Sequence, residues 1–175
     1  MTAPLSATVA FDGAVHRVES FKCGEEVLDR WLHAYAGQTQ RRDAARTFVT
    51  AEPDGKVAGY YTLVAAQVER AHSTARVRRG LSRHFPIPIA LLARLAVATS
   101  HQGIGLGRSL LLDALERVLR ASEELAIRAV AVDALNERAA SFYQQFGFES
   151  SDLALNTLMV PLDIVRRTLG RRPMS

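Results

Sequence analysis

Residues 92–115 read LARLAVATSHQGIGLGRSLLLDAL, a stretch that predicts a strand, a turn and a helix in succession. Three glycines stand at alternating positions in the turn: Gly103, Gly105 and Gly107. An interior glycine costs roughly 0.5–1 kcal/mol relative to alanine, so something other than folding should require this bare backbone. Residues 89–97 are apolar and short enough for a buried strand, and residues 105–121 repeat apolar side chains at helical spacing. A glycine turn that opens a helix predicts a phosphate site, because its backbone amides point at the anion.

The glycine run differs from two common phosphate-binding loops. Arg108 and Ser109 follow Gly107, so the Gly-Lys-Ser/Thr ending of a nucleoside-triphosphate loop is missing. The spacing is also not the G-x-G-x-x-G of a dinucleotide fold. The run reads Gln102-x-x-Gly105-x-Gly107, which is weak alone, because glycines before a helix are also ordinary turn residues.

The rest of the chain predicts a single α/β domain over residues 1–175. Apolar stripes at helical spacing predict helices over 25–40 and 136–147, and a short one at 163–170. β-rich runs predict a hairpin over 45–69, a strand over 127–135 and a late strand over 153–162. The basic stretch 70–88 is expected to be a loop with one short helical turn.

Composition excludes several classes of protein. The single cysteine, Cys23, precludes an internal disulfide, and the five histidines lack metal-ligand spacing, so no metal site is expected. No apolar run approaches the ~18 residues of a membrane span, and the N-terminus lacks a secretory pattern, so we expect a cytoplasmic protein. The net charge is +4, and Lys22 and Lys56 are the only lysines. Codon bias or a phosphate-rich partner would each explain this excess of arginine.

The glycine run and its flanks resemble the GNAT acetyltransferase superfamily, which binds acetyl-CoA through a (Gln/Arg)-x-x-Gly-x-(Gly/Ala) loop. LARLAV at 92–97 resembles the strand along which the pantetheine arm lies, and VDALNERAASFYQQFGF at 132–148 resembles the family's second segment. The resemblance implies an α/β (α+β) GNAT fold. Its mixed, mostly antiparallel sheet would splay in a V between the strands at 89–97 and 127–134, with helices on its flanks.

The same resemblance implies acetyl-CoA as cosubstrate and supplies its binding residues. The pantetheine amides would pair with backbone groups of Leu95, Ala96 and Val97. The pyrophosphate would meet the backbone of Gln102, Gly103, Ile104, Gly105, Leu106, Gly107 and Arg108. Asn136 would hydrogen-bond the arm or the nucleotide; it would equally serve as a helix N-cap, and the two roles can coexist.

Tyr143 stands where many of these enzymes place a tyrosine near the thioester sulfur. A phenol of pKa near 10 can donate a proton to a departing thiolate of pKa about 8.5. Packing is the alternative role for Tyr143, as it is the expected role for Phe142.

No carboxylate stands out as a general base. Glu52, Glu69 and Asp133 are candidates, and each would equally be a solvated surface charge. An α-amine, with a pKa near 7.7–8.0, needs less help than a lysine near 10.4, so the missing base favours an α-amine substrate.

The chain also resembles the GNAT-type toxins of bacterial toxin–antitoxin pairs over residues 15–165. The matching segments are FKCGEEVLDRWL, ARTFV, VAGYYTLVAAQVER, PIPIALLARLAV and FYQQFGF. This resemblance implies N-acetylation of the α-amino group of aminoacyl-tRNA, which blocks translation. It also implies that a ribbon-helix-helix antitoxin binds the chain and that the chain forms a homodimer. Family members often carry Asp where this chain has Ala98, which leaves the rigidity of the following loop in doubt.

The arginines become candidate tRNA contacts under this reading. Those expected beside the cleft are Arg76, Arg78, Arg79 and Arg83, and Arg46 belongs to a second patch with Arg41 and Arg42. A solvated arginine-rich loop is the alternative. Arg94 interrupts an apolar strand, so we expect it either to form a salt bridge in the core or to reach the acceptor end of the tRNA.

Two other functions remain open from the sequence. A GNAT enzyme of this kind would otherwise acetylate a protein N-terminus or a small-molecule amine, but such a substrate leaves the arginine clusters unexplained. A non-catalytic module that only senses acetyl-CoA would have no need of a proton donor such as Tyr143.

Overall fold

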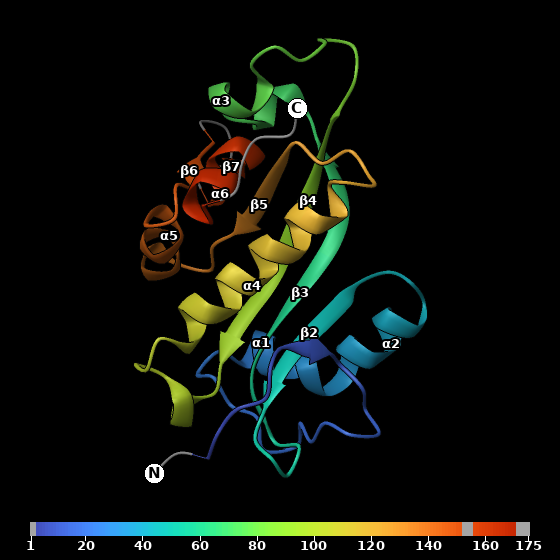
Figure 1. Cartoon of the computed structure of the whole chain (residues 1–175), viewed down its shortest axis with the longest axis vertical. Helices are drawn as coiled ribbons and strands as arrows, with labels where there is room; N and C mark the ends of the chain where they lie inside the picture. The colour runs from blue at the N-terminus through green and yellow to red at the C-terminus, as the bar shows by residue number, and fades with distance from the viewer. Residues whose placement is uncertain (1–2, 152–155, 171–175) are drawn as a thin grey trace. The chain divides into compact units, whose positions relative to one another are not determined.

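The structure is a computed structural model that describes residues 3–151 and 156–170. Its strands are β1 (Val9–Ala10), β2 (Arg46–Ala51), β3 (Val57–Val68), β4 (Ile87–Val97), β5 (Ala129–Asp133), β6 (Glu149–Ser150) and β7 (Thr157–Pro161). Its helices are α1 (Glu26–Arg30), the π-helical η1 (Trp31–Tyr35), α2 (Ala36–Arg41), α3 (Ala75–Arg78), α4 (Leu106–Ala121), α5 (Glu137–Gln144) and α6 (Leu162–Thr168). Short 3₁₀ turns form η2 (Arg70–His72) and η3 (Thr99–His101). The strands form one sheet in the order β1-β2-β3-β4-β5-β7-β6 (Figure 1).

The chain forms two compact units. The first falls within Met1–Val64 and Ala93–Ala114, and the second within Ala65–Leu92 and Leu115–Ser175. The prediction of a single domain over residues 1–175 stays a prediction.

The first unit contains the antiparallel strands β1 and β2 and most of β3. Phe21, Leu32 and Tyr60 are buried in its core. Gly59 sets how closely α4 approaches β3: a Cβ there would lie 2.8 Å from Leu110 Cδ1 and 3.3 Å from the Ala96 carbonyl oxygen. The bare backbone of Gly59 therefore lets the first turns of α4 lie directly against the strand.

The second unit pairs β4 with β5 in parallel, from Ile89–Ala129 to Leu92–Val132. β7 runs antiparallel to β5 on its other side, and α3 and α6 pack against β7. The register with β5 ends at Leu92, whereas β4 itself continues to Val97. Residues 93–97 therefore extend beyond the stretch that pairs with β5.

The predicted elements are found, with four differences in detail. The helix over 25–40 contains the π-helical turn η1, and the strand at 89–97 begins at Ile87, before Pro88. Pro88 lacks an N–H, but its carbonyl accepts from the Arg128 amide, so the strand tolerates it. The two-residue strands β1 and β6 were not predicted, since two residues show no periodicity. The late strand is confirmed at Thr157–Pro161, and residues 153–155 of that prediction lie outside the described residues.

Candidate active site

The loop over residues 102–107, the glycine loop, has the geometry of an anion cradle. Gly103 and Gly105 have φ of +78° and +85°, in the left-handed region that favours glycine. A Cβ built on either residue would meet nothing within 4 Å, so the backbone there faces open space. The first bond of α4 runs from the Ser109 amide to the Gly105 carbonyl at 3.1 Å. Among the described residues, the amides of Leu106 and Gly107 donate to no backbone carbonyl, so both are available to an anion at the helix N-terminus.

Side-chain and backbone bonds hold the glycine loop. Gln102 Nε2 donates to the carbonyls of Val97 and Cys23, both at 2.9 Å. The Ala98 amide donates to the Ala58 carbonyl at 2.8 Å. These bonds therefore anchor the loop without an aspartate at position 98. Leu95, Ala96 and Val97 end the strand immediately before this loop, in the same unit.

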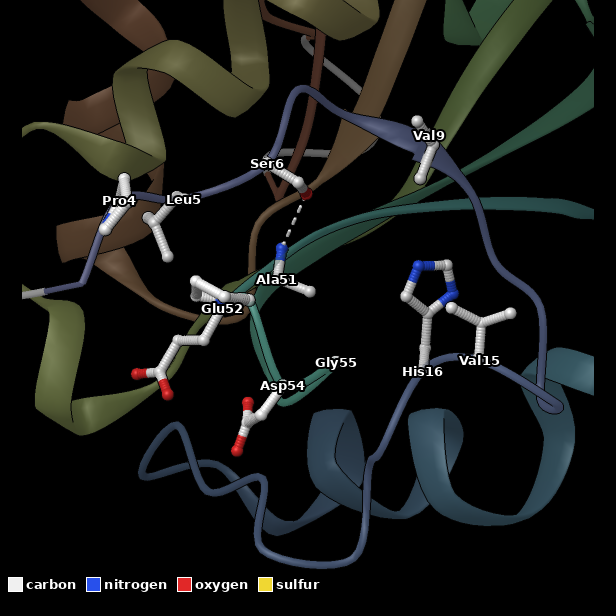
Figure 2. Close-up of a pocket in the computed structure, with 11 residues that line it drawn as sticks. Pro4, Leu5, Ser6, Val9, Val15, His16, Ala51, Glu52, Asp54 and Gly55 are labelled. Carbon is white, nitrogen blue, oxygen red and sulfur yellow. Dashed lines mark hydrogen bonds between the residues drawn. The ribbon is translucent and has the colours of Figure 1, made fainter.

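A buried histidine precedes the glycine loop. His101 is 4% exposed, and its Nδ1 lies 2.8 Å from Ser100 Oγ. Its Nε2 lies 3.2 Å from Glu52 Oε1. Glu52 also lines a pocket of about 580 Å³ between the N-terminal segment and the β2–β3 turn (Figure 2).

Asp133 and Glu69 are the other two candidate general bases. Asp133 accepts from Thr157 Oγ1 at 2.6 Å, and Glu69 is exposed just before η2. Glu52 and Asp133 therefore each contact another side chain, and a catalytic role for any of the three carboxylates stays a prediction.

Tyr143 and Asn136 lie together on α5 in the second unit. Tyr143 is 6% exposed, and its ring packs 5.5 Å from that of Phe148 and 5.2 Å from that of Phe142. Burial raises the pKa of Tyr143 above its ordinary value near 10, which keeps the phenol protonated. Asn136 Oδ1 accepts from the Ala139 amide at 2.9 Å, so its N-cap role is confirmed. Its contact with the nucleotide stays a prediction.

Cys23 is not an activated nucleophile. Burial, with a contribution from Asp29, raises the pKa of its thiol to about 11. The thiol is therefore protonated at neutral pH.

Arg94 stacks on an aromatic ring. Its guanidinium carbon lies 4.1 Å from the centroid of the Trp31 ring, in the range of a cation–π contact. Among the described residues, Arg94 Nε is buried without a hydrogen-bond partner, and no carboxylate forms an ion pair with the side chain. In the part of the chain that the structure describes, Arg94 therefore stacks on Trp31 and the expected salt bridge is not seen.

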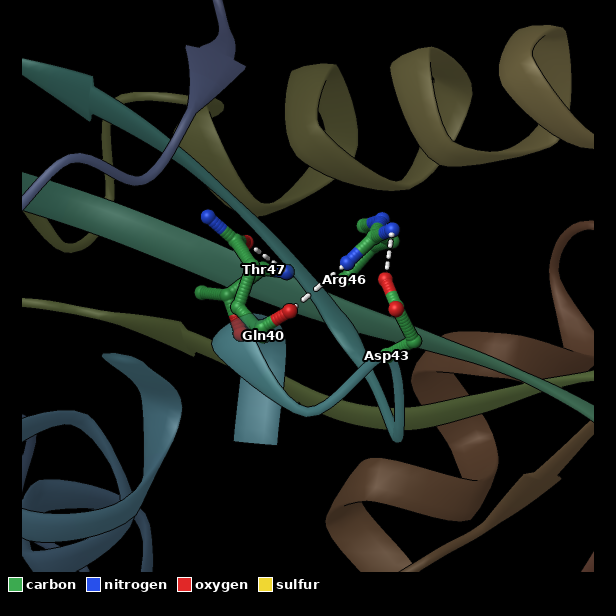
Figure 3. A network of polar contacts seen from close by, with 4 residues as sticks. All are labelled: Gln40, Asp43, Arg46 and Thr47. Carbon is green, nitrogen blue, oxygen red and sulfur yellow. Dashed lines mark hydrogen bonds and ion pairs between the residues drawn. The ribbon is translucent and has the colours of Figure 1, made fainter. Parts of the chain in front are cut away.

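Arg46 closes the turn between α2 and β2. Its Nη2 lies 2.6 Å from Asp43 Oδ1 and its Nη1 donates to the Gln40 carbonyl at 2.9 Å, while the Thr47 amide donates to Gln40 Oε1 (Figure 3). Asp43 has φ of +54°, which these contacts support. Arg46 therefore has a local structural role, and its contact with tRNA stays a prediction.

We call the segment over residues 70–86 the arginine loop. Its guanidinium groups make different contacts. Arg78 Nη1 donates to the Ser73 carbonyl at 2.7 Å, so it clamps the loop itself. Arg76 pairs with Glu149 at 2.6 Å, and Arg79 and Arg83 are exposed. All four belong to the second unit, whereas Arg46 and Arg94 belong to the first.

The structure adds three residues that sequence reasoning missed. Trp31 supports Arg94, Gly59 sets the position of α4, and Arg128 Nε donates to the Val77 carbonyl at 2.8 Å. The only sequence signals were a single tryptophan on a helical stripe, a glycine in a β-rich run and an arginine at the start of a strand.

The described residues contain neither a metal-binding cluster nor a membrane-spanning helix. Over 3–151 and 156–170, no three His, Cys, Asp or Glu side chains gather where they could hold a metal ion. No helix in the same ranges is long and apolar enough to cross a membrane.

The end of a strand, a glycine loop and a helix N-terminus in succession, all in the first unit, are typical of the GNAT class of acetyltransferase. The model of the acetyltransferase (GNAT) family matches residues 14–148, and the chain belongs to that family. It is 39% identical over 153 residues to a tRNA-acetylating toxin of Mycobacterium tuberculosis, a match that covers 87% of this chain and 90% of the toxin.

Solved structures agree with this assignment. AtaT complexed with acetyl-methionyl-tRNAfMet superposes with a TM-score of 0.85 at 30% identity, over 95% of this chain and 99% of that one. A tyrosine-to-phenylalanine mutant of AtaT, bound to the C-terminus of the antitoxin AtaR and acetyl-CoA, superposes with a TM-score of 0.82 at 29% identity, over 95% and 99% of the two chains.

Proposed function

We propose that this chain is an acetyl-CoA-dependent N-acetyltransferase that modifies the α-amino group of aminoacyl-tRNA and acts in the cytoplasm as a toxin that blocks translation. The observation that carries the proposal is the 39% identity to a tRNA-acetylating toxin over 87% of the chain. The glycine loop, the buried Tyr143 and the excess of arginine support it.

The glycine loop fits the acetyl donor. Acetyl-CoA, when bound, supplies a thioester whose acetyl carbon the neutral α-amine attacks, with loss of the sulfur as leaving group. The amides of Leu106 and Gly107 would hold its pyrophosphate, and the backbone of Leu95 to Val97 would hold the pantetheine arm. Tyr143 would donate its phenolic proton to the departing sulfur, and the proton released by the amine passes to water.

The proposed protein partners of this chain are inferred from the same relatives. AtaT is seen with its antitoxin AtaR, and we propose that an antitoxin neutralises this chain as well. That this antitoxin is a ribbon-helix-helix protein, and that the chain is a homodimer, stay predictions.

Acetyl transfer to total charged tRNA tests the proposal. The purified chain is incubated with labelled acetyl-CoA and charged bacterial tRNA, beside Tyr143→Phe as the matched variant. Phe keeps the ring that packs on Phe148 but lacks the phenolic proton, so label on the aminoacyl group should fall by roughly 10²–10⁴-fold. Binding of acetyl-CoA without label on tRNA would refute the proposal in favour of a protein N-terminus or a small amine as acceptor.

A further inference from the structure

A pocket of about 330 Å³ in the second unit is lined by four arginines: Arg76, Arg79, Arg128 and Arg167. Arg76 lies on α3 and Arg79 directly follows it, Arg128 precedes β5, and Arg167 lies on α6. Three segments that are distant in sequence thus contribute guanidinium groups to one hollow.

Positive charge prevails in this arginine pocket. Asp163 is the acidic side chain in its lining, and Glu149 pairs with Arg76 from beside it. Even with both carboxylates counted, four guanidinium groups face two negative charges. The Arg76–Glu149 pair is about half exposed, so water and salt screen it, and it can open to a competing anion.

The folded chain holds part of the arginine pocket in place before any ligand binds. Arg128 Nε donates to the Val77 carbonyl at 2.8 Å, and its Nη2 donates to the Arg79 carbonyl at 3.0 Å. Val77 is fully buried, and Thr74 caps α3 by accepting from its amide. Because Arg128 is already fixed, binding an anion costs less side-chain entropy than it would at a mobile surface arginine.

We infer that the arginine pocket binds a phosphate group in the body of the tRNA, as a contact separate from the reaction site. The inference rests on the proposed function. Guanidinium groups match phosphate oxygens in bidentate geometry, which favours phosphate over other anions.

The placement of Arg128 identifies which part of the tRNA is involved. Arg128 stands before β5, and Asn136, which we propose to contact bound acetyl-CoA, follows the other end of the strand. A strand of five residues rises about 17 Å at ~3.3 Å per residue. The phosphate is therefore one remote from the aminoacylated 3′ nucleotide: either a backbone phosphodiester of the acceptor stem or the 5′-terminal phosphate.

Removing charge from the rim of the pocket tests the inference. Arg167→Gln and Arg79→Gln alter exposed side chains, and Arg120→Gln is the matched control, an exposed arginine on α4 outside the pocket lining. We expect each pocket variant to lower kcat/KM for charged tRNA about 5- to 10-fold, mostly through KM, relative to kcat/KM for aminoacyl-adenosine. The slope of log(kcat/KM) against log[salt] should also become shallower by about one.

Binding of uncharged tRNA by fluorescence anisotropy separates this inference from the proposed function, because it needs no acetyl transfer. Weaker binding by the pocket variants alone supports the pocket even if acetylation fails. A dephosphorylated tRNA distinguishes the two sources: loss of the variants' effect identifies the 5′-phosphate, and its persistence identifies the backbone. Equal losses on tRNA and aminoacyl-adenosine, or unchanged tRNA affinity, would overturn the inference. Weaker binding of polyglutamate with unchanged tRNA affinity would also overturn it, in favour of an acidic peptide.

Discussion

The glycine loop and the arginine loop offer an anion different kinds of donor. In the glycine loop the donors are backbone amides, and the backbone at Gly103 and Gly105, with positive φ, faces open space. In the arginine loop the groups are long side chains, some of which bind the protein itself, as Arg78 does at the Ser73 carbonyl. A backbone site is thus defined by local sequence, whereas the role of each arginine depends on what lies opposite it in the fold.

The first prediction concerns pH, because the amides of the glycine loop and the guanidinium groups of the arginine loop do not titrate near neutral pH. Amides and guanidinium groups keep their charge state, and the raised pKa of Tyr143 keeps its proton beyond pH 10. The α-amine of the substrate alone should then govern kcat/KM, which rises about fortyfold from pH 6 to pH 8 for an amine pKa near 7.8. The pH–rate profile with charged tRNA measures this, and a decline between pH 8 and pH 9.5 would contradict it.

Substitution of the glycines tests the backbone site. Gly105→Ala forces a side chain into the left-handed region at a cost of about 1–2 kcal/mol, so the Kd for acetyl-CoA should rise roughly 5- to 30-fold. Gly107→Ala is the comparison variant: Gly107 lies inside α4 and outside the positive-φ set of the described residues, and alanine keeps the backbone amide proposed to bind the pyrophosphate. Calorimetric titration of both variants gives the comparison, and equal affinities would show that φ at Gly105 does not matter.

Substitution of Arg94 tests whether this arginine of the first unit contacts the substrate or only stabilises the fold. Arg94→Lys keeps the charge but loses the planar contact with Trp31, worth about 0.5–2 kcal/mol. We expect kcat/KM for charged tRNA to fall about tenfold in Arg94→Lys. Urea unfolding alongside separates the two roles. Full activity per folded molecule would make Arg94 a purely structural residue.

The smallest expected effect separates two arginines of the arginine loop. Arg78→Gln removes the bond to the Ser73 carbonyl and should cost about 1 kcal/mol, or roughly 2–4 °C in Tm. Arg83→Gln changes an exposed side chain, and its Tm should stay within about 1 °C. Thermal unfolding by circular dichroism distinguishes them. A larger loss in Arg83→Gln than in Arg78→Gln would reverse the assignment.

Local pattern was enough to predict most of the fold. The strand at 89–97, the glycine loop and the helix at 105–121 were predicted from periodicity and glycine spacing, and the structure contains all three. The π-helical turn at Trp31 and the close approach at Gly59 were not predicted. The approach at Gly59 depends on Leu110, and the stacking of Trp31 depends on Arg94, residues that the fold brings together from distant parts of the sequence.

The candidate site was likewise predicted only in part from the sequence. Gln102 and Asn136 were placed by motif, yet their bonds to the Cys23 carbonyl and the Ala139 amide became visible only in three dimensions. The arginine clusters were visible as charge, but sequence could not separate Arg78, which clamps the loop, from Arg79, which lines a pocket. No role was predicted for Arg128, because it stands outside those clusters.

The stacking of Arg94 on Trp31 also gives this chain an optical property. Trp31 is its only tryptophan, so all indole fluorescence arises beside one guanidinium group. A ligand that pulls Arg94 off the ring, or presses it closer, would change the emission of the unmodified protein. Substrate arrival at that strand can therefore be followed in a stopped-flow mixer without an attached dye.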